Sequence, residues 1–197
     1  MADFNDRGFE KSHRIGREGE LFYADLCKTK GLSTIDVTED PFFQLIDIDM
    51  IVAKDKDTQL TNEYVENLKN NILAHKEDYK SKSILIDVKT DTDIKRTNNV
   101  FLEFIAHNKP GCFSITKADK WIYLDWDENN KKAIRMWSID IEKVRNSIVK
   151  GDVKIGFNGV AECRKEYDGS GKEVGIYAWI VPIEHLKKIG CADNKNF

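Results

Sequence analysis

The chain lacks several features that would assign it to a particular class of protein. Its 197 residues include no apolar run near the roughly 20 residues that span a bilayer, and the N-terminus lacks the charged and then apolar pattern of a signal peptide. The four cysteines are widely spaced, without a CxxC pair or a matching histidine spacing, which favours reduced thiols over disulfides or a zinc site. We therefore expect no membrane association and a cytoplasmic protein.

An excess of charge of one sign is also missing. The 31 basic and 34 acidic residues nearly cancel, the net charge is −3 and the pI is about 5.9. Composition alone does not indicate a nucleic-acid-binding protein, so contacts with nucleic acid would have to come from a local basic patch or from a bound metal. With 41% hydrophobic residues and no internal repeat or low-complexity linker, we expect a single α/β domain over residues 1–197.

The strongest signal lies in the strand predicted over residues 83–91. Because side chains alternate along a strand, one face is apolar, and the opposite face carries Asp87 and Lys89 together with Leu85 and Asp91. Burying a carboxylate and an amine is costly unless the charges neutralise each other or bind a metal ion. A half-exposed strand whose charges simply meet water is the alternative interpretation, and this strand alone does not decide between the two.

A second polar strand is predicted over residues 43–53, after a turn-prone segment. Asp47 and Asp49 alternate there with apolar residues, so two carboxylates share one face. Like charges placed so close together repel each other, and a cation is expected nearby. The alternation does not decide which aspartate would be a metal ligand. We favour Asp49, which lies deeper in the strand, with Asp47 supporting it.

A helix over residues 15–31 precedes these strands. Its apolar positions share one face, and Gly31 is suited to end it. Glu20 lies near that face, where a role at the site competes with the ordinary stabilising effect of an acidic residue in a first helical turn. Residues 3–14 are interpreted as an arm or a short irregular lead-in.

The remaining elements complete an α/β arrangement. A first strand over residues 33–38 comes before the polar strands, and an exposed helix over about residues 58–80 is inserted between them. A basic loop then leads to a strand over residues 100–106 that holds Glu103 on an apolar face. A short helix and a further strand follow. Residues 127–197 are predicted to form an extension with a return strand, a helix, a β-hairpin and a final helix.

A common explanation is needed for five ionisable residues: Asp49, Asp87, Lys89, Glu20 and, less clearly, Glu103. Carboxylate oxygens are suitable ligands for Mg²⁺, which usually takes one or two of them together with water and phosphate oxygens. An amine beside the metal can position or deprotonate an attacking water and balance the charge that builds on a phosphate. These residue types therefore indicate metal-assisted chemistry on a phosphate group.

This arrangement resembles the PD-(D/E)XK nuclease superfamily, which includes restriction endonucleases and Holliday-junction resolvases. The matching segments, within a core of about residues 15–126, are residues 16–20 on the helix and residues 47–49 and 87–89 on consecutive strands. Further similarity to members carried by phages and mobile elements is found at Gln44, Asn99 and residues 116–123. Asp87 stands where glutamate is commoner, and the long segment between the two acidic strands requires the inserted helix.

The resemblance implies a restriction endonuclease-like core, in which helices pack on a mixed central β-sheet, and Mg²⁺ as the cofactor, for which Mn²⁺ can substitute. The implied catalytic residues are Asp49, Asp87, Lys89 and Glu20. The implied metal ligands are Asp49, Asp87, Glu20 and Asp47, with Glu18 as the alternative to Glu20. The candidate phosphate contacts are Lys95, Arg96, Arg17 and Lys11, although ordinary surface charge explains these residues equally well.

The leading hypothesis is therefore a Mg²⁺-dependent nuclease that hydrolyses phosphodiester bonds, with DNA as the expected substrate and RNA not excluded. A second hypothesis is a catalytically silent nucleic-acid- or protein-binding module that retains the nuclease fold. A third is a subunit of a homodimer or a larger complex, in which the C-terminal hairpin packs on a copy or a partner. The complete set of Asp49, Asp87 and Lys89 favours the first hypothesis.

Overall fold

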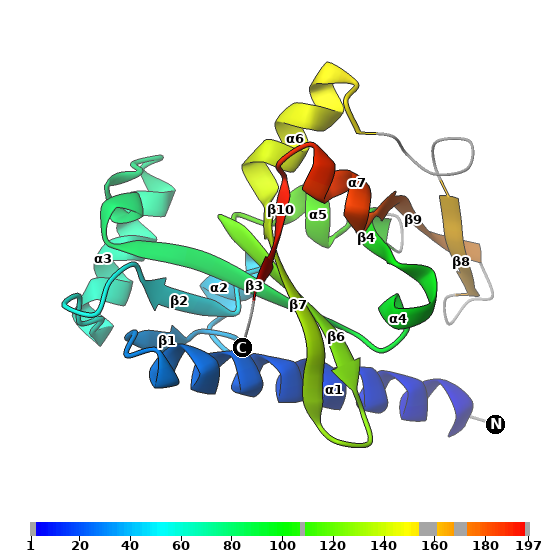
Figure 1. Cartoon of the computed structure of the whole chain (residues 1–197), viewed down its shortest axis with the longest axis horizontal. Helices are drawn as coiled ribbons and strands as arrows, with labels where there is room; N and C mark the ends of the chain where they lie inside the picture. The colour runs from blue at the N-terminus through cyan, green and yellow to red at the C-terminus, as the bar shows by residue number, and fades with distance from the viewer. Residues whose placement is uncertain (1–2, 107–108, 154–160, 168–172, 196–197) are drawn as a thin grey trace.

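A mixed β-sheet forms the centre of the α/β structure. Within residues 3–106, 109–153, 161–167 and 173–195, which the computed structural model describes, six strands form this sheet (Figure 1). In spatial order they are β1 (Thr34–Asp36), β2 (Met50–Ala53), β3 (Ser83–Asp91), β6 (Lys120–Asp127), β7 (Lys132–Asp140) and β10 (Ala192–Lys195). β3 and β6 are parallel, and the other neighbouring pairs are antiparallel. β3 thus lies inside the sheet, with a hydrogen-bonded strand on each side.

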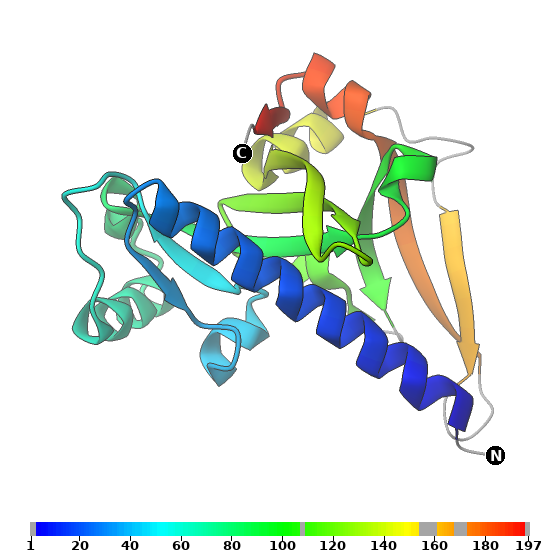
Figure 2. The ribbon, with the colours of Figure 1, turned by 60° about the horizontal axis from the view of Figure 1, so that its bottom comes forward.

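The long helix α1 (Asp3–Thr29) covers one face of this sheet and crosses it diagonally (Figure 2). The apolar core on this side joins Ile15 of the helix to Ile86 and Val88 of β3. Gly31, with a φ of 76°, lies just beyond the last turn of the helix, in the left-handed conformation that commonly ends a helix. The predicted end of this helix is therefore confirmed.

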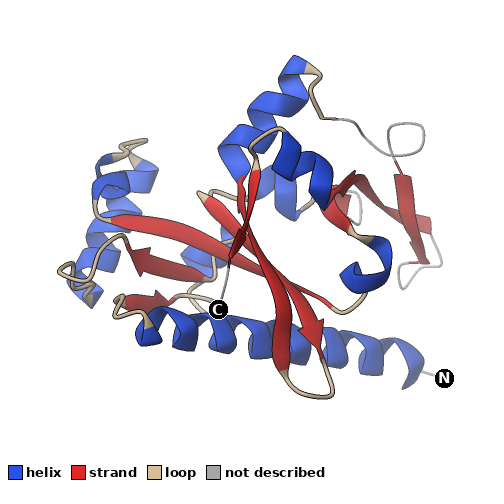
Figure 3. Ribbon diagram, in the orientation of Figure 1, coloured by secondary structure: helices blue, strands red, loops and turns tan. Residues whose placement is uncertain are grey.

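The opposite face packs against a second sheet and several helices (Figure 3). The second sheet is antiparallel, in the order β5 (Lys109–Pro110), β4 (Asn99–Ala106), β9 (Glu173–Pro182) and β8 (Ala161–Tyr167). The helices that contribute to this core include α3 (Asn62–Leu73), α5 (Cys112–Ile115), α6 (Ile141–Lys150) and α7 (Ile183–Lys188). Leu85 and Trp121 of the central sheet belong to the same buried core as Leu102 of the second sheet. The predicted class, α/β with a mixed sheet flanked by helices, is confirmed.

Residues 3–14, predicted as an irregular lead-in, form the first half of α1 instead. Long-range ion pairs hold this part of the helix against the turn between β6 and β7. Lys11 Nζ lies 2.9 Å from Glu128 Oε2, and Arg14 Nη2 lies 3.1 Å from Glu128 Oε1. The prediction was wrong because it rested on local apolar periodicity, whereas helices in proteins gain most of their stability from tertiary contacts.

The strand predicted over residues 43–53 is wrong in its first half. Asp40 caps helix α2 (Pro41–Leu45) by accepting a hydrogen bond from the backbone in its first turn, and a proline at the first helical position favours the helix start. The chain then turns through Asp47, whose φ is 53°. Asp47 and Asp49 therefore lie in the connection before β2 and not on one face of a strand.

The other predicted elements differ in smaller ways. The helix predicted over about residues 58–80 is divided into α3 and a 3₁₀ helix, η1 (Asp78–Ser81), and the basic loop after β3 contains α4 (Ile94–Thr97). The strand predicted over residues 100–106 is β4 of the second sheet. The return strand, helix, hairpin strands and final helix of the extension are present as β7, α6, β8, β9 and α7, while β10 is additional. The predicted turn between β8 and β9 lies outside the described residues. No helix in the described ranges is long and apolar enough to cross a membrane.

Close packing of α1 on β3 requires a glycine at position 19. A Cβ atom there would lie 2.1 Å from Thr90 Oγ1 and 3.2 Å from Leu124 Cδ1, whereas a Cβ atom at Gly16 would meet no atom within 4 Å. We expect Gly19→Ala to lower the free energy of unfolding by about 1–3 kcal/mol because of overpacking. Gly16→Ala should raise it by about 0.5–1 kcal/mol because alanine favours a helix. Urea unfolding of the two variants gives the measurement.

A double variant tests the cause of this effect. Thr90 Oγ1 is buried and has no hydrogen-bond partner among the described residues, so Thr90→Ala removes the clashing atom without breaking a hydrogen bond. Combined with Gly19→Ala, it should restore a large part of the lost stability. Equal stability of the Gly19→Ala and Gly16→Ala variants would contradict the packing described.

Candidate functional site

The candidate site lies where β2 and β3 separate. Asp49 N donates to Ile86 O (3.0 Å), and Asp49 Oδ2 accepts a hydrogen bond from Val88 N (2.7 Å). The Asp49 side chain thus takes the place of the next backbone carbonyl in the antiparallel ladder. Asp47, with its positive φ, belongs to the turn just before this point. Two carboxylates therefore reach the polar end of β3 from a turn and not from a strand.

Lys89 of β3 joins these carboxylates into a cluster. Its Nζ lies 2.7 Å from Asp87 Oδ2, and 3.2 and 3.4 Å from the two carboxylate oxygens of Asp47. The same atom lies 5.2 Å from the centre of the Trp121 ring, within cation–π range. Asp47 is fixed in turn, because Thr116 Oγ1 donates to its backbone carbonyl (3.1 Å). We call the group formed here the carboxylate–lysine cluster: Asp47, Asp49, Asp87 and Lys89.

Burial dominates the electrostatics of the cluster. Only 1% of the Asp87 side chain is exposed, and desolvation raises the pKa of its carboxyl well above the usual value. Desolvation also raises the pKa of Asp49. Burial alone would lower the pKa of Lys89, but the charges of Asp87 and Asp47 outweigh this effect and raise it well above the usual value. Lys89 therefore stays protonated and offsets part of the repulsion between the carboxylates.

The donor atoms of the cluster suit a divalent cation, although the side chains do not surround one as they stand. In the part of the chain that the structure describes, no group of three or more His, Cys, Asp or Glu side chains is positioned to hold a metal ion. Lys89 is ion-paired with Asp47 and Asp87 instead. When ionised, three carboxylates and one amine leave a formal excess of two negative charges. The buried Asp87 Oδ2 has this ion pair but no hydrogen bond. Carboxylate oxygens are the donors that Mg²⁺ prefers, and Mg²⁺ as the cofactor stays a prediction.

Glu20 reaches the same region from α1 but is held by other partners. Its Oε2 accepts hydrogen bonds from Arg17 Nη1 (2.7 Å) and Thr38 Oγ1 (3.1 Å), and Thr38 Oγ1 also lies 3.3 Å from Asp49 O. Burial raises the pKa of Glu20, and the neighbouring charge of Asp49 adds to the rise. Glu18, the alternative, is ion-paired with a lysine of the β6–β7 turn (3.0 Å). The metal-binding role of Glu20 stays a prediction.

The four basic residues predicted to contact phosphate differ in their surroundings. Lys11 and Arg17 are engaged in ion pairs with acidic side chains, at 2.9 Å for Lys11 and at 2.6 and 2.7 Å for Arg17. Lys95 and Arg96 are exposed on α4, directly after β3. Arg96 has one 3.5 Å ion pair with Asp93, which is itself exposed. Lys95 and Arg96 are therefore the better candidates for contacts with a ligand.

A cavity of about 530 Å³ opens beside Lys89, between the end of β3 and the second sheet. Its lining includes Tyr123, whose hydroxyl donates to Asp91 Oδ2 (3.0 Å), and Glu103, the weaker acidic candidate from the sequence. Cys112 also lines it, and burial raises the pKa of that thiol to about 12. The sequence pattern did not indicate this cavity, because its walls come from strands of two different sheets.

The residues that hold the cluster in place were not recognised from the sequence. Thr38 and Thr116 bond to backbone or side-chain oxygens far away in the chain, which no local pattern reveals. Trp121 is the Cα partner of Asp87 in the parallel pairing of β3 with β6. Its proximity to Asp87 can be inferred only once this strand pairing is known.

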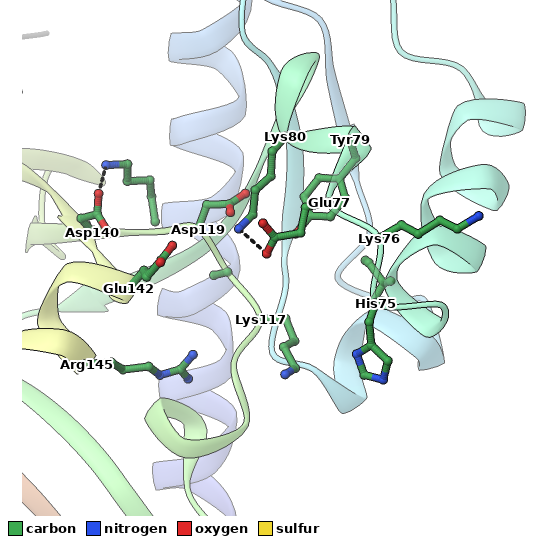
Figure 4. A pocket seen from close by; sticks show the side chains of 13 residues that line it. His75, Lys76, Glu77, Tyr79, Lys80, Lys117, Asp119, Asp140, Glu142 and Arg145 are labelled. Atoms are coloured by element: carbon green, nitrogen blue, oxygen red, sulfur yellow. Dashed lines mark hydrogen bonds and ion pairs between the residues drawn. The ribbon is translucent and has the colours of Figure 1, made fainter. Parts of the chain in front are cut away.

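A second cavity, of about 440 Å³, lies between η1, the segment before β6 and the start of α6 (Figure 4). Charged side chains gather around it, but several of them pair with one another. Lys80 lies 2.7 Å from Glu77, and a neighbouring lysine lies 2.8 Å from Asp140. Arg145 donates to two backbone carbonyls. The four cluster residues are not among its lining residues, so this cavity is separate from the candidate site.

Similarity to known proteins does not assign a family. No protein-family model, curated protein or solved structure matches this chain. We therefore infer a function from the geometry of the carboxylate–lysine cluster and from the motif resemblance.

The raised pKa of Asp87 has a measurable consequence for stability. An acid whose pKa is higher in the folded state binds its proton more tightly there. The free energy of unfolding therefore falls as the pH rises above about 4, where this carboxyl ionises in the unfolded chain. Asp87→Asn resembles the protonated form. In metal-free buffer we expect it to raise the free energy of unfolding at pH 7, where the buried carboxylate is costly, and we expect no gain near pH 4.

Urea unfolding in EDTA measures the difference in stability between Asp87→Asn and the unsubstituted chain. The measurements run from about pH 4, near the ordinary carboxyl pKa, to about pH 8. Asp25→Asn, at an exposed position of α1, is the matched control and should show little pH-dependent change. An Asp87→Asn variant less stable than the unsubstituted chain at pH 7 would contradict the electrostatic description.

Proposed function

We propose that this chain is a Mg²⁺-dependent nuclease that hydrolyses phosphodiester bonds in DNA. The observation that carries the proposal is the convergence of Asp49, Asp87 and Lys89, together with Asp47, where β2 and β3 separate. Buried charges of this kind are usually no more stabilising than apolar residues of similar size. A cluster of perturbed ionisable groups beside a cavity is therefore better explained by function than by stability.

The order of elements supports a restriction endonuclease-like core. Helix α1 is followed by the antiparallel strands β1, β2 and β3, and the short helix α5 precedes β6, which is parallel to β3. This is the order that the motif resemblance implies. We propose that β4, β5, β8 and β9, which form the second sheet, are additions to that core.

In the proposed reaction, Asp49 and Asp87 would hold the metal ion, and Asp47 and Glu20 are further candidate ligands. Mg²⁺ bound there would polarise a phosphoryl oxygen of the substrate and lower the pKa of a water. Val88 N fixes one carboxylate oxygen of Asp49, which leaves the other oxygen as its donor. Lys89 leaves its ion pairs to orient the attacking water and balances negative charge on the phosphate with its ammonium group.

The alternative function is a catalytically silent binding module, alone or as a subunit of a homodimer or a larger complex. One observation favours it: Lys89 and its two carboxylate partners form a closed set of ion pairs, as in a purely structural cluster. The two functions differ in one property that is simple to measure. A nuclease of the proposed type requires a divalent cation, and a silent module does not.

Cleavage of supercoiled, linear and branched DNA, and of RNA, tests the proposal. We expect strand cleavage with Mg²⁺ or Mn²⁺ and none with EDTA. Lys89→Ala and Asp87→Asn should each lower the rate by at least about 100-fold, because each removes a group that acts on the water or the metal. Lys82→Ala, at an exposed lysine outside the cluster, is the matched control and should leave the rate unchanged.

A thermal-unfolding titration with Mg²⁺ separates metal binding from chemistry. Binding to the folded state should raise the unfolding midpoint of the unsubstituted chain and of Lys89→Ala, but not that of Asp49→Asn or Asp87→Asn. An unsubstituted chain that cuts no substrate and shows no response to Mg²⁺ would overturn the nuclease and support the silent module.

Lys95 and Arg96 provide a test of backbone binding. With Lys89→Ala as background to prevent cleavage, replacing either residue by alanine should weaken binding to DNA of any sequence. Each loss should also reduce the slope of log affinity against log salt by about 0.9. Lys11→Ala should have a smaller effect, because its amine is paired with Glu128. Fluorescence anisotropy over a range of salt concentrations measures these slopes, and identical slopes for all variants would contradict the assignment.

A further inference from the structure

The cavity beside Lys89 has one wall formed by β4. Alternation along this strand places Asn99, Phe101 and Glu103 on the face that lines the cavity, while Val100 and Leu102 point into the core shared by the two sheets. The exposed side of β4 thus combines an amide, an aromatic ring and a carboxylate in a row. These side chains do not contribute to the buried core.

The opposite wall belongs to the central sheet and is already hydrogen-bonded. Lys89 and Asp91 share a face of β3, and Tyr123 pairs with Lys89 across the parallel β3–β6 ladder. The Tyr123 hydroxyl donates to Asp91 Oδ2 (3.0 Å), while Asp91 Oδ1 accepts hydrogen bonds from two backbone N–H groups at the start of α4 (2.6 and 3.0 Å). Tyr123 and Asp91 are therefore committed to the structure of this wall.

Asn99 and Glu103 keep most of their hydrogen-bonding capacity. Within the described ranges, the Asn99 side chain makes no hydrogen bond, and the Glu103 carboxylate accepts one long bond, 3.4 Å from Cys112 N. The Gly111 backbone passes close to Glu103, because a Cβ atom at Gly111 would lie only 2.8 Å from Glu103 Cγ. The cavity thus offers an acceptor and, four residues away along the same strand, a group that can donate and accept.

This composition selects a particular kind of ligand. The carboxylates of Asp91 and Glu103 disfavour a phosphate group inside the cavity, although the adjacent Lys89 and its cluster suit one at the rim. Phe101 and Tyr123 provide apolar ring surface for a flat group. A volume of about 530 Å³ lies within the range of small-molecule sites. A nucleobase combines a flat ring with hydrogen-bonding edges.

We propose that this cavity binds an unpaired nucleobase that carries an exocyclic amino group, beside the phosphodiester bond that the chain cuts. The amino group donates to Glu103, and Asn99 bonds to the neighbouring ring nitrogen or carbonyl. Cytosine, adenine and guanine have such a group, whereas thymine and uracil do not. This inference rests on the proposed nuclease function and adds a preference for an unpaired nucleotide, because a base must leave its stack to enter a pocket.

Duplexes with one unpaired nucleotide at a fixed position test the preference. We expect kcat/KM for an unpaired cytosine to exceed that for an unpaired thymine or an abasic site by roughly 5- to 100-fold, the range given by a good hydrogen-bonded base contact. Glu103→Gln, whose amide can donate to a thymine carbonyl, should reduce or reverse the ratio between cytosine and thymine. Asn99→Ala should lower the ratio as well.

Two substitutions on α3 serve as matched controls. Glu63→Gln and Asn70→Ala make the same chemical changes at exposed positions and should keep the ratio of the unsubstituted chain. A ratio near 1 for the unsubstituted chain, or a ratio that Glu103→Gln leaves unchanged, would overturn the assignment of the cavity.

Binding of free nucleosides gives a second test that does not depend on cleavage or on correct folding of a variant. Deoxycytidine, which carries no phosphate, should produce saturable NMR shifts at the Asn99 side-chain amide and at residues 99–103 of the unsubstituted chain. Thymidine should bind several-fold more weakly.

Cleavage without a base preference, together with absent shifts, would overturn the base site and leave the nuclease intact. Saturable shifts without cleavage of any substrate would overturn the nuclease and support the base site.

Discussion

The burial of Asp87 beside Lys89 is the constraint around which the rest of the structure is arranged. β3 has a hydrogen-bonded strand on each side and is covered on both faces, so a carboxylate at position 87 cannot reach water. A single ammonium group at 2.7 Å, shared with Asp47, makes this burial tolerable. The charged side chains of Asp87 and Lys89 on the central strand could therefore be replaced by apolar residues of similar size without loss of stability.

The two faces of β3 divide the tasks of stability and chemistry. The face toward α1 is apolar, and the absence of a side chain at Gly19 lets the helix approach Thr90 closely. The other face presents Asp87 and Lys89, and β2 pairs with β3 only as far as the residues before them. Because the strand is fixed by packing on both faces, its charged groups are held on a rigid element, which is what precise positioning of ligands requires.

Local patterns were sufficient for β3 and insufficient for most of its surroundings. Alternation is a property of neighbouring residues, so Asp87 and Lys89 could be assigned to one face directly from the sequence. Asp47 and Asp49 were included in the right cluster, but for the wrong reason, because the predicted strand is a capped helix followed by a turn. The first half of α1, the second sheet and β10 depend on contacts far apart in sequence, and no periodicity reveals such contacts.

The position of the cavity follows from chain continuity. Only α4 separates β3 from β4. The segment from β3 to β4 therefore supplies residues of the charged cluster on its first strand and the cavity wall with Asn99 and Glu103 on its second strand. The two parts nevertheless belong to different sheets that share a core through Leu85 and Leu102. Side chains on the exposed face of β4 can therefore change without disturbing either the core or the cluster on β3. Under the proposed function, the choice of ligand and the reaction itself would be set by separate strands.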